Sequence, residues 1–592
     1  MSEPKGSGLG LDPASPSTPR RAWPRQLIVL AALAVAAAFQ FLPCKNATQH
    51  PQEVGTVHWK PASECNENTD CGSVIVPKDY FNPDAGTASI AIARYRATKS
   101  PKRGTVFMNP GGPGGSGLRL ASETFADIVG HDWDLLGFDP RGIGQTSPQV
   151  ACFESAEDYN FFVSNTVLEQ GYNVLSSSNR SDPALEASFV EQSREFIALK
   201  KTQAELCAKN MGDELRYMGT ANVVRDMDLM AQLFDGKGAK INYWGASYGS
   251  ILGAYLVNML PHRSGKVVID GIADPVSWST EPSHLWAANW VASAEKTYIF
   301  YLETCSKAGP EACPLAQYEG ELYQDIMDRI EAFLDKLVGT PLPVPFGVRP
   351  GYLTSGAARS LLLMYLERPP QYAEAALAFS QAMAGNGTLL FNKLVTKRPD
   401  SVPHTDLTRL GVTCMDSPPP ASRRDIPTPE DLAKALLLAM EASPHFGASV
   451  LVGEPDGGCQ YWPVRGPERF AGPWNATLEW PMLIVSNTMD PITPIQSGLR
   501  INSLMGNSTR IIVQDGPGHC STATPSPCTV KLVQNYYAGI LPENGTVCDT
   551  SFDYFPDSQE VSGLEALGVE DEKLMRSVLD AGKILQDIQR RW

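Results

Sequence analysis

The chain has 592 residues, of which 43% are hydrophobic and 19% are charged. This composition is typical of a globular protein, and the length suits one large domain with insertions or two to three ordinary domains. The formal net charge of −16 argues against nucleic acid as a partner, because phosphate binding needs a basic face. The chain has no GxxxxGK[ST], HExxH or CxxC motif, so neither a P-loop nor the commonest zinc sites are predicted, and no metal or cofactor is implied.

The N-terminal region predicts entry into the secretory pathway. Residues 1–26 are rich in Pro and Ser and are expected to form a disordered cytosolic tail. The apolar segment 27–42 follows three arginines, which favours a single type II signal-anchor with the rest of the chain lumenal or extracellular. Its small residues also suit signal peptidase cleavage near Ala38, after which the protein would be secreted.

Cysteines and glycosylation sequons agree with that route. The chain has twelve cysteines, without metal-ligand spacing to histidines, and six N-x-[ST] sequons. The sequon asparagines are Asn46, Asn179, Asn386, Asn475, Asn507 and Asn544. The sequence therefore predicts a disulfide-bonded glycoprotein.

Six short apolar runs predict strands of a parallel sheet that is covered on both faces. Each run is hydrophobic without alternation, which is the pattern of a buried parallel strand. The runs are Gly104–Asn109, Asp134–Asp139, Lys240–Gly245, Lys266–Asp270, Pro481–Asn487 and Thr509–Gln514. An earlier stretch, Ser73–Arg96, alternates between apolar and polar residues more regularly than these six runs, and it predicts antiparallel edge strands.

Helical patterns between these runs predict a mostly parallel α/β sheet with a large insertion. Thr220–Phe234 has apolar residues on one helical face, with Thr220 as the expected N-cap, and Ser250–Leu260 is a second helix. The expected domains are a core at 57–275 with an insertion at about 150–215, a helical lid at 276–475, a second core segment at 476–550, and an acidic linker with a helix at 551–592.

The third run leads into Gly245-Ala246-Ser247-Tyr248-Gly249, a G-x-S-x-G motif between a strand and a helix. A sharp strand-to-helix turn lifts the serine clear of the sheet, and small neighbours let the chain turn without clashes. The serine then lies at a helix N-terminus, where backbone amides favour developing negative charge. This context predicts that Ser247 is a nucleophile.

A serine nucleophile needs a base and an acid. Among eight histidines, only His519 follows a buried strand in a Gly/Pro turn at the carboxyl end of the sheet. Asp490 directly follows the strand before it. The order Ser247, Asp490, His519 is the one expected of an α/β-hydrolase triad, in which the acid holds the imidazole tautomer.

A glycine-rich loop follows the first central strand, in the sequence PGGPGGSG at 110–117. Glycines let backbone amides approach a substrate oxygen, so the Gly112 and Tyr248 amides are the expected oxyanion-hole donors. A phosphate-binding loop is the alternative, but the loop has no lysine and no G-x-G-x-x-G register with a ribose-binding acid.

The segments NPGGPGGSG, DLLGFDPRGIGQTSP, YWGASYGSILGAYLVNMLP, VVIDGIADP, MDPITP and GPGHCS together resemble the α/β-hydrolases of peptidase family S33. The resemblance covers roughly residues 57–550 and is to the tripeptidyl aminopeptidase-like subgroup. It implies an α/β-hydrolase fold with a helical lid, the triad named above, and release of short peptides or proline from free N-termini. Asp139 and Arg141 fall in a segment interpreted as structural. Pro110 stands where prolyl iminopeptidases carry a histidine. This difference does not harm the oxyanion hole, because the hole uses backbone amides.

The family pattern also implies two disulfides, Cys414–Cys459 and Cys528–Cys548. Proximity in sequence or segment suggests three more, Cys65–Cys71, Cys152–Cys207 and Cys305–Cys313. Cys44 and Cys520 have no obvious partner, and Cys520–Cys528 is a rival pairing.

The expected function is a serine hydrolase acting through an acyl-enzyme on a peptide or small-molecule acyl substrate, most simply an exopeptidase acting on free N-termini. A carboxylic-ester hydrolase and a non-catalytic binding protein are the alternatives, because fold alone does not choose the bond that is cleaved. An aminopeptidase needs a carboxylate that binds the substrate ammonium. Candidates in the lid, none of them preferred, are Glu281, Glu295, Glu303 and Asp416. The sequence does not predict an oligomeric state.

Overall fold

The computed structural model describes residues 53–175, 181–395, 405–450, 456–556 and 568–588. The expected tail and signal-anchor, together with Cys44, Asn46 and Asn179, lie outside the described residues. Within the described ranges, no helix combines the length and the apolar character that crossing a membrane requires.

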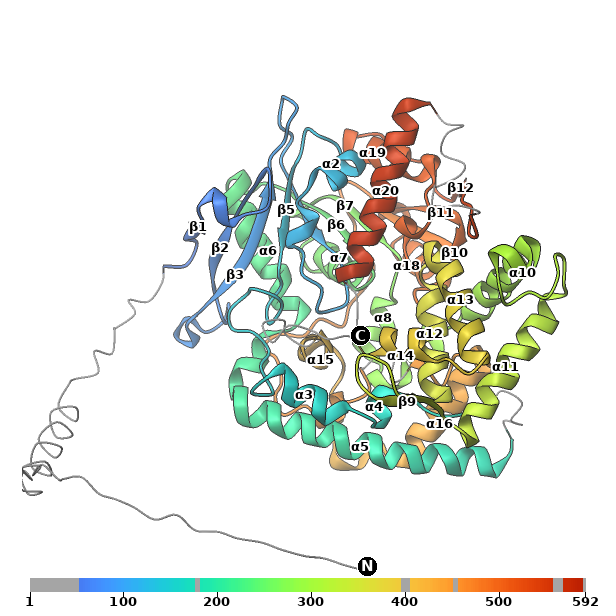
Figure 1. Ribbon diagram of the computed structural model, residues 1–592. Coiled ribbons are helices and arrows are strands. Elements are labelled where there is room, and N and C mark those ends of the chain that lie inside the picture. Colours follow the sequence, from blue (N-terminus) through green and yellow to red (C-terminus); the bar gives the residue numbers. More distant parts are fainter. Residues whose placement is uncertain (1–52, 176–180, 396–404, 451–455, 557–567, 589–592) are drawn as a thin grey trace, which may run out of the picture. The chain divides into compact units, whose positions relative to one another are not determined.

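A ten-stranded, mostly parallel sheet forms the centre of the described chain (Figure 1). Its order is β1-β2-β3-β5-β4-β6-β7-β10-β11-β12, with antiparallel pairing only from β1 to β5. The strands are β1 Val57–Trp59, β2 Thr69–Pro77, β3 Thr87–Tyr95, β4 Thr105–Asn109, β5 Asp134–Phe138, β6 Ile241–Ala246, β7 Ser264–Asp270, β10 Met482–Met489, β11 Thr509–Pro517 and β12 Thr546–Asp549. All six predicted parallel strands and the predicted antiparallel edge are therefore confirmed.

Helices cover both faces of the sheet because successive strand residues point to opposite sides. On one face, Tyr243, Ile269 and Ile484 pack against α6 Thr220–Asp235, α7 Tyr248–Met259 and α18 Ile495–Met505. On the other face, Trp244 and Val485 pack against α2 Glu123–Val129, α19 Pro527–Ala538 and α20 Val569–Ile588. This burial on two sides explains why the strands read as continuous apolar runs.

One predicted helix cap is wrong. The N-cap of α6 is Gly219, and Thr220 is the first helical residue. The Thr220 hydroxyl bonds to the Asp416 carboxylate and to the Tyr248 hydroxyl instead of capping the helix. A long-range partner has replaced the local one that the sequence suggested.

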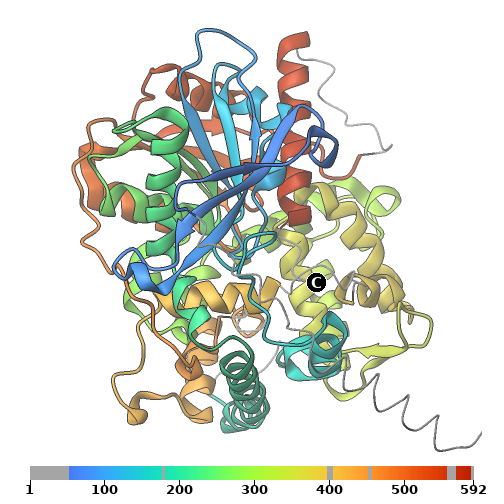
Figure 2. The same ribbon diagram turned by 90° about the vertical axis from the view of Figure 1, so that its left-hand side faces the viewer.

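The segment between β7 and β10 forms a mainly helical insertion, referred to below as the lid (Figures 1 and 2). Its elements are α8 Pro275–Thr280, α9 Ala287–Trp290, α10 Ala294–Ala312, α11 Tyr323–Gly339, α12 Ser355–Leu366, α13 Tyr372–Met383, α14 Thr388–Leu394, α15 Thr405–Asp416 and α16 Pro429–Ala442, with a hairpin of β8 Leu342–Val344 and β9 Gly351–Leu353.

The earlier insertion contributes α3 Ala156–Val163, α4 Val167–Gln170 and α5 Pro183–Met211. Buried Phe189 and Phe196 of α5 share an apolar cluster with Leu432 and Leu436 of α16. The two insertions, far apart in sequence, therefore pack together.

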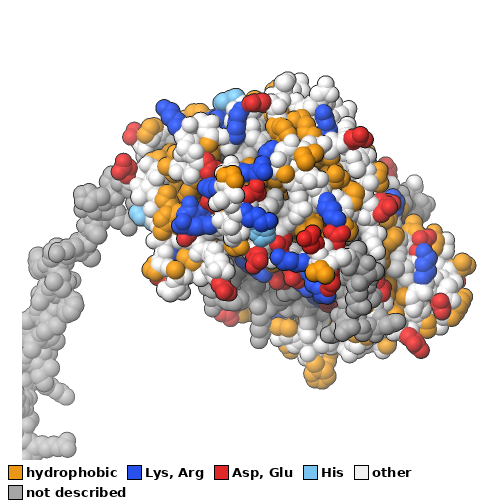
Figure 3. All heavy atoms as spheres, turned by 90° about the horizontal axis from the view of Figure 1, so that it is seen from above, with side chains coloured by type: hydrophobic (Ala, Val, Ile, Leu, Met, Phe, Trp, Pro, Cys, Tyr) orange, Lys and Arg blue, Asp and Glu red, His pale blue; other side chains and the backbone are white. Residues whose placement is uncertain are grey.

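The C-terminal helix α20 joins several parts of the core. Its Ser577 hydroxyl donates to Asp127 of α2 at 2.7 Å, and Asp571 pairs with Lys531 of α19 at 2.7 Å. Gly582 packs so closely on the Thr522 carbonyl that a Cβ would lie 2.5 Å from its oxygen. Figure 3 views this end of the molecule and shows acidic and basic side chains interspersed over it.

The structure contains the five disulfides that the sequence suggested: Cys65–Cys71, Cys152–Cys207, Cys305–Cys313, Cys414–Cys459 and Cys528–Cys548. The rival pairing Cys520–Cys528 is wrong, because Cys520 is a buried free cysteine. The sequon asparagines within the described residues are exposed: Asn386, Asn475, Asn507 and Asn544.

Candidate active site

Ser247 lies at the sharp turn between β6 and α7. Its backbone has φ 58° and ψ −122°, a left-handed conformation that a non-glycine residue adopts only under constraint. Two constraints are visible, since the Ser247 amide donates to the Asp270 carbonyl at 2.9 Å and the Ser247 carbonyl accepts from the Ser250 hydroxyl at 2.6 Å. The strained elbow expected of a nucleophile turn is present.

Asp490 and His519 come together at the carboxyl end of the sheet, after β10 and β11. His519 Nδ1 lies 3.0 Å from Asp490 Oδ2 and 3.2 Å from Oδ1. Asp490 also accepts bonds from the amides of Ile492, Thr493 and Cys520. The carboxylate is therefore held in place and orients the imidazole.

Thr493 is a further member of this group. Its hydroxyl lies 2.6 Å from Asp490 Oδ2 and 3.0 Å from His519 Nδ1. It also lines the cavity that contains Ser247. The DPITP turn in the sequence places a threonine three residues after the acid, but the turn alone does not indicate this double contact.

The serine and the histidine are linked through Asp270, the last residue of β7. Besides accepting the Ser247 amide at its backbone carbonyl, Asp270 accepts from the amide and the hydroxyl of Ser521, two residues beyond His519. Within the described residues, no hydrogen bond joins the Ser247 hydroxyl directly to the His519 ring. Such bonds are often long in proteins without substrate and shorten in the reacting complex.

Buried charge sets the acid–base properties of the group. Burial would raise the pKa of Asp490, but the His519 charge and the Thr493 bonds hold it below its usual value. Burial would lower the pKa of His519, but Cys520 and the Asp490 carboxylate hold it well above its usual value. Burial raises the pKa of the Cys520 thiol to about 12, so at neutral pH the anionic partner of His519 is Asp490.

The glycine-rich loop packs directly on the elbow. A Cβ at Gly111 would lie 2.4 Å from the Ala246 carbonyl oxygen and 2.8 Å from Ser247 Cβ, so only glycine fits. Gly112 has φ +111°, and within the described residues neither its amide nor that of Tyr248 donates to another protein group. Both expected oxyanion donors thus lie beside the serine, unpaired.

Two small cavities flank the group. One, of about 20 Å³, contains Ser247, Gly112 and Tyr248 and is otherwise walled by residues of the lid and the core: Ala273, Trp278, Trp290, Arg409, Ile492 and Thr493. The other, of about 10 Å³, contains His519 and Cys520, and its walls include Glu367 and Arg368 of the lid and Leu585 and Gln586 of α20. Residues of the lid therefore line the cavities at both Ser247 and His519, and the C-terminal helix lines the one at His519.

None of the four lid carboxylates considered from sequence lines either cavity. Asp416 is buried and accepts from Thr220 and from Trp278 Nε1. Glu295 bonds to His445, and Glu303 is exposed. Glu367 is the one acidic residue among those that line the two cavities, and no local sequence signal pointed to it.

Comparison with known proteins agrees with this geometry. Residues 104–299 match a family model described as α/β hydrolase fold, and residues 443–548 match one described as TAP-like protein. Serine protease Hip1 of Mycobacterium tuberculosis is 27% identical over 558 residues, 88% of this chain and 98% of the relative.

Two further relatives carry different activities in their names. Tripeptidyl aminopeptidase of Streptomyces coelicolor is 26% identical, covering 79% of this chain and 80% of that protein. Carboxylesterase B of Mycobacterium tuberculosis is 29% identical, and the match covers 81% of this chain and 86% of that protein. With its mostly parallel sheet, this chain is an α/β-hydrolase similar to peptidase family S33, and a serine hydrolase.

Proposed function

We propose that this serine hydrolase is an exopeptidase that releases short peptides or single residues from free N-termini. The observation that carries the proposal is the strained Ser247 elbow, packed against the glycine-rich loop and sharing its cavity with Thr493, whose hydroxyl contacts the Asp490–His519 pair. The names of two relatives, a serine protease and a tripeptidyl aminopeptidase, support amide substrates.

The proposed reaction begins when Ser247 Oγ attacks the scissile carbonyl carbon while His519 Nε2 takes the hydroxyl proton. The carbonyl π electrons move to oxygen, and the amides of Gly112 and Tyr248 stabilise that oxyanion. His519 then protonates the leaving amine as the C–N bond breaks, which leaves an ester on Ser247. Water, deprotonated by His519, releases the acyl group and restores the serine.

We further propose that Glu367 recognises the substrate ammonium. Its backbone carbonyl accepts the His519 amide at 2.9 Å, so its side chain starts next to the reacting atoms. Glu367 is one of the residues that line the His519 cavity, and within the described residues its side chain makes no hydrogen bond or ion pair. A carboxylate so placed would favour a free amine over a blocked one.

Carboxylic-ester hydrolysis is the second candidate function. The cavity around Ser247 is walled largely by Trp278, Trp290 and Ile492 and contains no carboxylate, which suits an apolar acyl group. The carboxylesterase name of one relative points the same way.

The deciding experiment uses the full chain from a secretory host, labelled with a fluorophosphonate and tested on Ala-Ala-Phe and Pro chromogenic amides, their N-blocked forms, and a short nitrophenyl ester. We expect labelling at Ser247, loss of activity in Ser247→Ala, and cleavage of free-amine peptides. Ester turnover alone would move the function to the second candidate. Absence of labelling would favour a binding protein.

The role of Glu367 is tested with Glu367→Gln against Glu303→Gln, an exposed lid glutamate. We expect Glu367→Gln to lower kcat/KM on free-amine peptides by about 10- to 100-fold, as for one charge-assisted contact. The nitrophenyl ester and the Glu303→Gln control should be unaffected. An equal loss on the ester would assign Glu367 a structural role.

The disulfides indicate an extracellular or secreted protein. We propose that residues 27–42 bring it there, either as an uncleaved type II anchor or as a signal cleaved near Ala38. Fractionation of expressing cells distinguishes the two, since the anchor predicts activity in the membrane pellet and cleavage predicts activity in the medium.

A further inference from the structure

Arg409 is a buried arginine of lid helix α15 that reaches the glycine-rich loop. It is 4% exposed and lines the cavity that contains Ser247. Its Nη1 donates to the Gly112 carbonyl at 2.7 Å. Its Nε and Nη2 donate to the two oxygens of Asp456 at 2.8 and 2.6 Å. One guanidinium therefore ties a lid carboxylate to the backbone of the expected oxyanion-hole residue.

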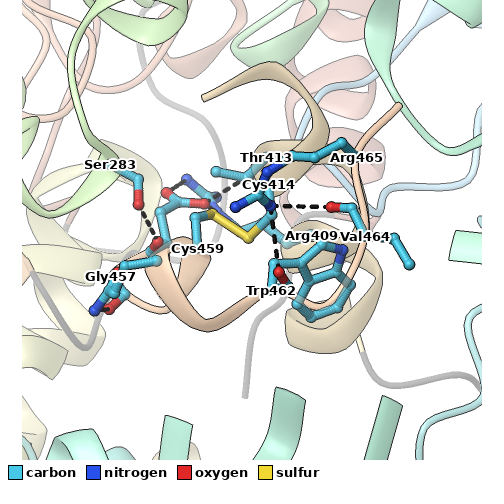
Figure 4. Close-up of a disulfide and its surroundings, with 11 residues drawn as sticks. Ser283, Arg409, Thr413, Cys414, Gly457, Cys459, Trp462, Val464 and Arg465 are labelled. Atoms are coloured by element: carbon cyan, nitrogen blue, oxygen red, sulfur yellow. Dashed lines mark hydrogen bonds and ion pairs between the residues drawn. A yellow bond between two sulfur atoms is a disulfide. The ribbon is translucent and has the colours of Figure 1, made fainter. Parts of the chain in front are cut away.

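We call the Arg409–Asp456 ion pair, with its bond to the Gly112 carbonyl, the Arg409–Asp456 clamp. Its Asp456 end is itself fixed. Asp456 accepts from the Thr413 hydroxyl at 2.8 Å, and its backbone carbonyl accepts from Ser283 at 2.7 Å. The disulfide Cys414–Cys459 joins α15 to the segment that carries Asp456. Figure 4 shows the disulfide at the centre of this cluster, with Ser283 and Gly457 to one side and Trp462 and Arg465 to the other. Arg409 is thus held by several buried contacts and has little freedom to move.

The Gly112 end needs such a support. Gly112 has φ +111°, and although Pro113 restricts it, a glycine still has more backbone freedom than other residues, whereas oxyanion stabilisation requires its amide to point at one place. Contact with the elbow fixes Gly111, but that contact does not hold the far side of Gly112. The charge-assisted bond from Arg409 fixes the Gly112 carbonyl and so restricts rotation of the residue.

We propose that Arg409 is a positioning residue that holds the oxyanion-hole glycine from the lid. The hole is then complete only when the lid is docked with the Arg409–Asp456 clamp formed. This inference rests on the proposed role of the Gly112 amide. It assigns part of the transition-state stabilisation to a lid side chain that takes no proton and forms no covalent bond.

The test replaces both charges, since removing one would leave the other buried and unpaired. Arg409→Gln with Asp456→Asn keeps a polar group at both positions. The glutamine side chain is shorter than that of arginine, so it cannot bridge position 456 and Gly112. The matched control is Arg359→Gln with Glu331→Gln, a buried lid pair at 2.7 Å that touches neither cavity wall. Arg409→Lys serves as a second variant, because lysine keeps the charge but lacks the planar guanidinium that donates to two partners at once.

The measurements are kcat and KM on the nitrophenyl ester, affinity for a boronic acid that forms an oxyanion-like adduct with the serine, and the unfolding midpoint. For the Arg409/Asp456 variant we expect kcat and boronate affinity to fall together by about 10- to 100-fold, with KM changed less than about threefold. Arg409→Lys should show a smaller loss of the same kind. The Arg359/Glu331 control should retain the kcat and the boronate affinity of the unaltered protein.

Three outcomes would overturn the inference. If kcat and boronate affinity stay within threefold of the Arg359/Glu331 control, the clamp only holds the lid in place. If KM rises while kcat is kept, Arg409 binds substrate instead of positioning the hole. If the unaltered protein is not labelled at Ser247 by a fluorophosphonate, the proposed function fails first, and this positioning role fails with it.

Discussion

Gly111 offers the sharpest test of the site, because its backbone touches the nucleophile turn. In Gly111→Ala the new Cβ would meet the Ala246 oxygen at 2.4 Å and Ser247 Cβ at 2.8 Å, where ordinary contact begins at 3.4 Å. The backbone oxygen cannot rotate away, so the loop must move by about 1 Å. A displacement of that size costs about 100-fold in rate, and loss of one oxyanion donor costs about 100- to 1000-fold. We therefore expect kcat to fall by at least about 100-fold.

Gly236→Ala is the matched control. Gly236 has φ +96°, against +97° for Gly111, and no atom lies within 4 Å of the place that its Cβ would take. Both variants place an alanine at nearly the same positive φ, which costs about 1–3 kcal/mol, so the comparison reports mainly on the contact with the elbow.

The assay is nitrophenyl ester turnover and the rate of fluorophosphonate labelling, with the unfolding midpoint followed by circular dichroism. We expect slow labelling only in Gly111→Ala, and a lower midpoint for Gly111→Ala than for Gly236→Ala, because only the former must shift its backbone. The reasoning is refuted if Gly111→Ala turns over substrate within threefold of Gly236→Ala, because the loop would then tolerate displacement without loss of the hole.

Two further predictions concern protons. Asp490→Asn should lower kcat by about 10⁴-fold. Its residual activity should persist to lower pH, because the carboxylate helps hold the pKa of His519 above its usual value and only the neutral imidazole accepts the serine proton. A pH–rate profile that does not shift would contradict this. Burial raises the pKa values of Asp139, Asp270 and Asp416 to about 6, so the folded state binds more protons than the unfolded state between about pH 4 and 6. Stability should therefore rise as pH falls from 7 to 5, although partial burial lowers the pKa of half-buried His284 to about 4, which acts in the opposite direction. Thermal unfolding at both pH values checks this, and an unchanged or lower midpoint at pH 5 would speak against it.

The sequence predicted the parts of the site whose signals are local. A strand, a turn and a helix around Ser247 are encoded within a short window, as are the turns that follow β10 and β11. The sheet was predictable for the same reason, since burial on both faces produces runs of apolar residues that need no partner to be recognised. The short strands β1 and β12 were missed because neither has such a run.

The lid residues could not be predicted, because their roles depend on contacts made across the fold. Arg409 donates to the Gly112 carbonyl, the Glu367 carbonyl accepts the His519 amide, and the Thr220 hydroxyl donates to Asp416 instead of capping its helix. Nothing within a few residues of any of these side chains specifies its partner. Turn and strand patterns describe neighbours along the chain, whereas these contacts join segments far apart in sequence.

The position of α20 has a consequence for biosynthesis. The Ser247 elbow is made early in translation, whereas the loop that carries His519 and the helix that packs on it through Gly582 are among the later described segments. During synthesis the growing chain thus carries the proposed nucleophile before its proposed base. If these roles hold, hydrolysis has to wait until this late portion has been made and has docked.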